Sequence, residues 1–287
     1  MTSASRNSPR RLAVALAALL LPAVAVTGCT VSEDQEVQMG AADAAQINEQ
    51  LPLVSDQVVN DYVNALGDSI ARRTSRADLD WHFYVVDSPE VNAFALPGGF
   101  IYVNRGLVER ADRVDELAGV LGHEIGHVVR RHSIKQMQQE QKANVGLALA
   151  CTLTKVCQSD AARVAINVGG TALFARHSRL DESQADSEAV GNVVRAGYDP
   201  EGIPALFKIL IEERRTSPTI VDAFFASHPL EEQRVANTEH VIDALDPSSL
   251  RGLVQDTPAF HAFKRRLESL PPSPVPQRQG AEGQVVP

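Results

Sequence analysis

The stretch that decides the fold of this chain is Leu121-Gly122-His123-Glu124-Ile125-Gly126-His127. Apolar residues spaced by three and four lie on both sides of it. This spacing predicts a helix with one apolar face, which begins near Asp112. The helix is expected to end at the basic run 130–132, because cations are favoured at the negative end of the helix dipole.

Two histidines at this spacing predict a metal site. Side chains four residues apart on a helix lie side by side, so His123 and His127 can bind one ion, expected to be zinc. Glu124 lies about 100° further around the helix, where it reaches a water molecule at the metal but not readily the metal itself. Zinc activates such a water and polarises a carbonyl group. Glu124 is therefore the candidate catalytic base.

A catalytic zinc ion needs a third protein ligand. The metzincin pattern is excluded, because it requires a glycine at position 130 and a histidine at position 133, where the chain has Arg130 and Ser133. Further along, Glu182 and Asp186 are four residues apart on a second expected helix. Glu182 could bind the metal while Asp186 accepts a hydrogen bond from a ligand histidine. From spacing alone, a solvated acidic helix face is an equally good interpretation.

The remaining pattern predicts an α+β fold that is mostly helical. A helix is expected from Asp56 and a strand over residues 81–86. Two short apolar runs, 92–96 and 100–103, flank the turn Pro97-Gly98-Gly99 and predict a hairpin. Most of the chain from residue 112 to about residue 215 has helical spacing. The expected sheet is therefore small.

Residues 1–28 have the layout of an export signal. Three arginines precede an apolar segment over residues 12–26, which is shorter than the ~20 residues that span a bilayer. The stretch Val26-Thr27-Gly28-Cys29 resembles a bacterial lipoprotein cleavage box, which predicts lipid modification of Cys29. An ordinary signal peptide that happens to end near a cysteine is the alternative.

Charge and composition divide the rest of the chain. The net charge is −9, and it becomes −12 once residues 1–28 are removed with their three arginines. This balance excludes a nucleic-acid partner. Residues 29–48 are polar and acidic, which predicts a flexible tether. Residues 49–268 form the expected domain, and the apolar-poor residues 269–287 predict a disordered tail.

Two further cysteines, Cys151 and Cys157, leave two interpretations open. An exported protein can keep a disulfide. Residues six apart in one straight helix lie about 9 Å apart along its axis, so a bridge would need a turn between them. Two buried free thiols are the alternative.

Four stretches of the chain, between about Asp56 and Leu245, resemble peptidase family M48, which includes the CAAX prenyl proteases and bacterial envelope quality-control enzymes. They are Asn92–Gly99, Leu121–His127, Ser178-Arg179 followed by Glu182–Asp186, and Ser227-His228-Pro229 followed by Arg234. The resemblance implies a zincin-like (gluzincin) metalloprotease fold with one zinc ion per chain. It also implies that Glu182 is the third ligand and that Asp186 supports the site.

The resemblance assigns further residues to the cleft. The strand around Asn92, Ala93 and Phe94 is expected to border it and to pair with an extended substrate. For the Phe94 side chain itself, sheet packing is the favoured interpretation. His228 and Arg234 are expected near the active site, where they would stabilise an oxyanion.

The other histidines are expected to matter less. In an alternative interpretation, His228 fills the open position of zinc in a resting form. His132 and His177 are expected to have structural roles only, because they lie off the ligand face or outside the motifs.

These features predict an endopeptidase that cleaves polypeptides, with misfolded or misassembled cell-envelope proteins as its substrates. Because Thr30 follows Cys29, the expected location is the periplasmic face of the outer membrane in a Gram-negative bacterium, and otherwise the cell surface. A zinc-stabilised chaperone or assembly factor and a passive lipoprotein scaffold are the alternatives. Glu124 favours the protease, since a binding protein needs no base there. The sequence leaves the oligomeric state open.

Overall fold

A computed structural model describes residues 30–141, 177–229 and 232–273 of the protein. The predicted signal segment, Cys29, Cys151, Cys157 and residues 274–287 of the predicted tail lie outside the described residues. Within the described ranges, no helix is both long enough and apolar enough to cross a membrane.

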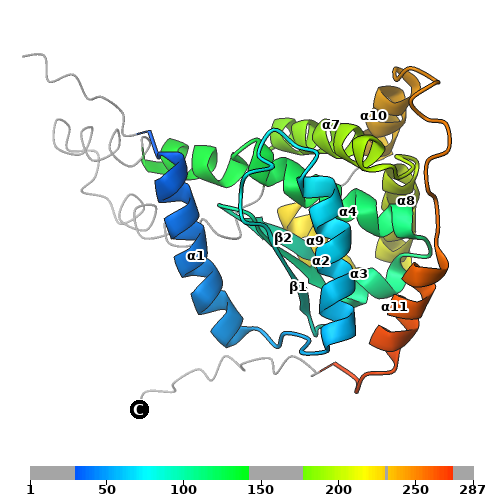
Figure 1. Ribbon diagram of the computed structural model, residues 1–287, viewed down its shortest axis with the longest axis horizontal. Coiled ribbons are helices and arrows are strands. Elements are labelled where there is room, and N and C mark those ends of the chain that lie inside the picture. Colours follow the sequence, from blue (N-terminus) through cyan, green and yellow to red (C-terminus); the bar gives the residue numbers. More distant parts are fainter. Residues whose placement is uncertain (1–29, 142–176, 230–231, 274–287) are drawn as a thin grey trace, which may run out of the picture. The chain divides into compact units, whose positions relative to one another are not determined.

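The described residues form a mostly helical α+β fold with one small sheet, as the sequence predicts (Figure 1). The strands are β1 (His82–Val86), β2 (Ala93–Leu96) and β3 (Phe100–Asn104). The helices before the sheet are α1 (Glu33–Gln50) and α2 (Gln57–Ala71). Those after it are α3 (Arg105–Arg110), α4 (Val114–Val129), α7 (Arg179–Ala196), α8 (Gly202–Thr216), α9 (Pro218–Ser227), α10 (Glu232–Asp243) and α11 (Pro258–Glu268).

The sheet has the strand order β1-β3-β2, so β2 is an edge strand. The pairing of β2 with β3 is antiparallel, which confirms the predicted hairpin, whereas β1 runs parallel to β3. The turn depends on glycine, because φ is 81° at Gly98 and 105° at Gly99. Residues with a Cβ atom rarely adopt such positive φ angles.

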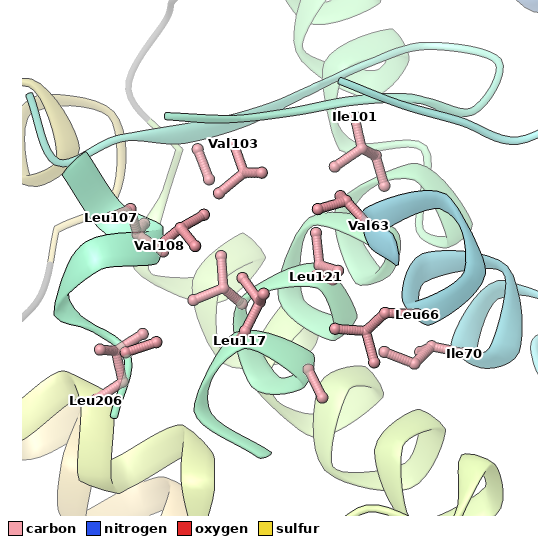
Figure 2. Packing of buried hydrophobic residues seen from close by; sticks show 14 of the residues in the cluster. Val63, Leu66, Ile70, Ile101, Val103, Leu107, Val108, Leu117, Leu121 and Leu206 are labelled. Atoms are coloured by element: carbon pink, nitrogen blue, oxygen red, sulfur yellow. The ribbon is translucent and has the colours of Figure 1, made fainter. Parts of the chain in front are cut away.

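One face of the sheet packs on the helix that carries the two histidines. Ile101 and Val103 of β3 point toward α2 and α4, and they belong to the same buried core as Val63 and Leu121 (Figure 2). Ile101, Val103 and Leu121 are fully buried. Burial of each such side chain contributes about 1.5–3 kcal/mol, which fixes α4 against the sheet.

Helices α4 and α7 approach closely because α4 presents glycines to α7. A Cβ atom on Gly126 would lie 2.9 Å from the carbonyl oxygen of Ala185, and one on Gly122 would lie 3.0 Å from Val193. A larger residue at either position would push the helices apart. The glycines of the quoted stretch therefore bring α7 within reach of its histidines.

The structure differs from the prediction of a flexible tether over residues 29–48. Residues 33–50 form α1, which is capped by Ser32. Glu36 of α1 is fully buried, where it pairs with Arg76 at 2.7 Å and with Arg131 at 2.6 Å. The sequence hides this contact, because α1 has a weak apolar face and its partners lie far away along the chain. The first residues of the predicted tail also pack, since Arg105 donates to the carbonyl of Pro271 at 2.7 Å.

Candidate metal centre

Four helices bring the candidate site residues together. His123, Glu124 and His127 lie on α4, Glu182 and Asp186 on α7, His228 directly after α9, and Arg234 on α10. Ligand atoms of His123, His127, Glu182 and His228 all lie within 4.8 Å of one another, and all four residues are buried. The three ligands predicted from the sequence thus converge.

The distances between these atoms suit a shared cation. Nε2 of His127 lies 3.1 Å from Nε2 of His123, and Oε1 of Glu182 lies 3.4 Å from Nε2 of His127. Nδ1 of His228 lies 3.2 Å from Oε1 of Glu182. Imidazole nitrogens and a carboxylate are the donors that zinc prefers. Burying so many lone pairs face to face is costly unless a proton or a cation lies between them.

The electrostatics of His228 point the same way. Burial opposes protonation of its ring, yet the carboxylates of Glu124 and Glu182 raise its pKa to about 9. The buried carboxylates therefore favour a positive charge at the position where a metal would sit. The donor set and its charge fit a metal ion.

Glu124 lies beside the ligand group without joining it. Its side chain is 1% exposed, and its Oε1 has no hydrogen-bond partner in the part of the chain that the structure describes. The nearest charged partner, Nε2 of His228, is 3.6 Å away. Burial raises the pKa of Glu124. A buried carboxylate with a free oxygen and a raised pKa is well suited to accept and return a proton.

Asp186 and Arg234 contact the predicted ligand side chains without belonging to the ligand group. Oδ1 of Asp186 lies 2.9 Å from Nδ1 of His123, which leaves Nε2 of that ring for the metal. Arg234 donates to Asp186 through Nε at 2.9 Å and through Nη2 at 2.7 Å, and it also pairs with Glu182. Burial opposes ionisation of Asp186, but Arg234 and His123 lower its pKa below the usual value. Arg234 thus contacts Asp186 and Glu182, and Glu182 is one of the residues that could hold a metal.

Reasoning from the sequence missed His132, which is 1% exposed. Its Nδ1 lies 2.9 Å from Nδ1 of His127, and its Nε2 lies 3.1 Å from Oε1 of Gln184 on α7. A residue five positions along one helix would not face His127. Here α4 ends at Val129, and Arg131 takes a positive φ of 56° before the next helix begins at residue 132. The residues Arg130 and Arg131 do not indicate from the sequence that the backbone changes direction here.

His177 was also expected to be structural, but its ring lies against the site. Its centroid is 4.0 Å from that of His127. Burial is the main cause that lowers its pKa to about 4, so the ring is neutral at physiological pH. Its position follows from the backbone bond that it donates to Ser227, next to His228.

The edge strand β2, which packs against α4, offers backbone groups that β3 does not use. The N–H of Asn104 donates to the carbonyl of Asn92 at 2.9 Å, which sets the alternation along the hairpin. The backbone groups of Ala93 and Ala95 therefore face away from β3. Within the described part of the chain, no strand pairs with that outer edge. The Phe94 side chain stacks on Tyr102 at 4.7 Å, the sheet packing expected for it.

A family model for peptidase family M48 matches residues 57–242, which include every site residue on the four helices. The chain belongs to peptidase family M48. Membership confirms the resemblance seen in the sequence, and with it the class of metallopeptidase. The family implies a bound metal, and the buried group of His123, His127, Glu182 and His228 could hold it.

Curated M48 proteins are similar to this chain over much of its length. It is 29% identical to the Beta-barrel assembly-enhancing protease of Escherichia coli (strain K12) over 248 residues, which is 83% of this chain and 49% of that protein. It is 28% identical to the Mitochondrial metalloendopeptidase OMA1 of Schizosaccharomyces pombe over 179 residues, covering 62% and 51% of the two chains. The chain thus spans about half the length of these relatives.

Proposed function

We propose that this M48 chain is a zinc-dependent endopeptidase that cleaves cell-envelope proteins. The observation that carries the proposal is the convergence of His123, His127 and Glu182 beside Glu124, whose Oε1 has no hydrogen-bond partner among the described residues. These residues would hold one zinc ion per chain. Zinc supplies Lewis acidity, which polarises the scissile carbonyl and lowers the pKa of a water molecule.

The chain's own residues then move the proton. Glu124 accepts it from the attacking water and returns it to the leaving amine, so one carboxylate acts first as base and then as acid. Asp186 fixes the ring of His123, and Arg234 fixes Asp186 and Glu182. Arg234 has most of its donors in use, which supports a positioning role over direct oxyanion stabilisation.

His228 is proposed to fill the fourth position of the metal in a resting form. Its Nδ1 lies among the ligand atoms, 3.4 Å from Nε2 of His123. A catalytic zinc ion keeps one position open for water, so a His228 ring that occupied this position would have to move before cleavage. A His228→Ala variant that cleaves faster than wild type supports this role, whereas slower cleavage favours a role in oxyanion stabilisation.

The substrate is proposed to be an extended polypeptide that pairs with β2. The outward N–H and C=O groups of Ala93 and Ala95 would provide the hydrogen bonds. Pairing through the backbone is independent of sequence, which suits unfolded substrates.

The cellular setting is proposed from Cys29 and from the relatives. A lipid on Cys29 would anchor the chain at the periplasmic face of the outer membrane in a Gram-negative bacterium, and otherwise at the cell surface. The relatives' name, which refers to β-barrel assembly, supports misfolded or misassembled envelope proteins as substrates. It also favours a second function, as an assembly factor with little cleavage.

Casein cleavage by the purified chain, together with elemental analysis, tests the proposal. We expect about one zinc per chain and cleavage that a chelator abolishes. Bound zinc without any cleavage would favour the assembly factor, and absence of a bound metal would contradict both functions. A pull-down from envelope extract with Glu124→Gln would then identify trapped substrates.

A further inference from the structure

A pocket lies at the turn end of β2, outside the metal centre. It is formed where α1, the hairpin and the helix that begins at residue 132 meet. Its lining residues are Met39 and Asp43 of α1, Ala95 and Pro97 of the hairpin, and Ser133, Ile134 and Met137. Among the described residues that line it, most are apolar and Asp43 is the one acidic group.

The pocket adjoins the outer edge of β2, with which no strand of the described residues pairs. Ala95 lines it, and the backbone groups of Ala95 are among those that face outward from the sheet. A strand paired with this edge would therefore run past the pocket, and every second side chain would lie on the same face of the sheet. One of these side chains is in position to enter.

The pocket also adjoins the metal centre along the chain. Ser133 and Ile134 directly follow His132, whose ring contacts the ligand His127 at 2.9 Å. The pocket therefore lies between the outer edge of β2 and the chain segment that follows the predicted ligand His127. A side chain held there would fix the register of the substrate relative to Glu124.

We propose that this pocket is a specificity subsite that takes an apolar side chain of an extended polypeptide paired with β2. The proposal rests on the proposed peptidase function and assigns part of substrate choice to α1. Two methionines line the pocket, and their flexible side chains adapt to apolar groups of different shape. Asp43 disfavours an acidic side chain at the same position.

The position of α1 makes this role possible. A Cβ on Gly40 would lie 1.7 Å from the carbonyl oxygen of Pro97, so α1 crosses directly over the hairpin turn. Met39 is next to this contact, and Asp43 is one helical turn further along. The ion pair of the buried Glu36 with the partly exposed Arg131 holds the same helix to the segment that follows α4.

A peptide series tests the proposal. The substrates are internally quenched peptides in which one position at a time carries Leu, Phe, Ala or Asp. Their cleavage rates are measured with wild type, Met39→Phe and Asp43→Asn. Gln38→Phe is the matched control, because Gln38 is an exposed α1 residue that does not line the pocket. Binding of the same peptides to these variants in a Glu124→Gln background is measured by fluorescence anisotropy.

We expect wild type to prefer Leu or Phe over Asp at one position by about tenfold or more, the value of one apolar side chain in a pocket. Met39→Phe should lose that preference in cleavage and in binding, while Ala peptides and the Gln38→Phe control stay unchanged. Asp43→Asn should reduce the ratio between the cleavage rates of Leu peptides and Asp peptides. This second variant keeps the test decisive if Met39→Phe folds poorly. Active variants with an unchanged preference would overturn the subsite alone, whereas a wild type that cleaves no peptide would contradict the proposed function.

Discussion

Nδ1 of His132 lies 2.9 Å from Nδ1 of His127, and the planes of the two rings are inclined at 75°. Because Oε1 of Gln184 accepts from Nε2 of His132, the Nδ1 atom of His132 is left as an acceptor. His127 then donates its Nδ1–H, and its Nε2 lone pair is free for a metal. Oδ1 of Asp186 lies 2.9 Å from Nδ1 of His123, and this proximity of a carboxylate favours the same tautomer there. Each predicted histidine ligand therefore has its own partner.

Loss of this partner should weaken metal binding. We expect His132→Ala to reduce zinc affinity about 10- to 100-fold, because outer partners orient the ligand ring. His132→Asn, whose amide oxygen can accept the same bond, should recover part of the affinity. Isothermal titration with zinc provides the measurement, with exposed His240→Ala as the control. Equal affinities for wild type and His132→Ala would show that the contact is incidental.

Arg234 should matter for stability as well as for activity. Arg234→Met leaves the buried carboxylates of Asp186 and Glu182 without their cation, which should cost about 3–5 kcal/mol in the free energy of unfolding. Urea denaturation of the variant measures this loss. Arg215→Met is the control, because the Arg215 side chain is 64% exposed. If Arg234→Met were as stable as wild type, the role of Arg234 in compensating these buried carboxylates would be contradicted.

Helix α1 should be part of the folded domain. Glu36→Ala removes the buried carboxylate that pairs with Arg76, which then keeps, among the described residues, only Glu33 as an acidic partner at 2.8 Å. We expect a loss of about 1–3 kcal/mol in unfolding free energy, the value of hydrogen bonds to a charged group. Glu49→Ala in the same helix should change little, since Glu49 is exposed. Thermal unfolding compares the two variants. Equal midpoints would restore the interpretation of this segment as a tether.

Removal of the metal should lower the melting temperature. A ligand that binds only the folded state stabilises it by about 2.7 kcal/mol at a hundredfold excess over its Kd. Chelation should reverse this gain, and added zinc should restore it. Glu182→Gln loses a ligand and should respond much less to either treatment. A melting temperature of wild type that is insensitive to chelator would argue against a metal at this site.

The sequence was sufficient for the local parts of the fold. Periodic apolar residues predicted α4, and the Pro97-Gly98-Gly99 turn predicted the hairpin. Both signals lie within a few residues of the element that they specify. The spacing of Glu182 and Asp186 also predicted a second helix that carries both carboxylates. The choice of Glu182 as a ligand needed the family resemblance.

Contacts between distant segments could not be predicted in this way. Glu36 meets Arg131 across 95 positions of sequence, so a polar segment seemed to be a tether. His132 seemed to point away from the ligands because the backbone reversal at Arg131 occurs without a glycine. Both errors arise where a buried polar contact, and not an apolar pattern, fixes the structure.

Casein cleavage by Glu124→Gln, compared with wild type at equal zinc content, tests the central claim most directly. Glutamine keeps the shape of the side chain but cannot accept the proton from water. We predict the same bound zinc in both proteins and a rate of cleavage at least about 100-fold lower in the variant. Equal cleavage by the two zinc-loaded proteins would contradict the assignment of Glu124 as the catalytic base.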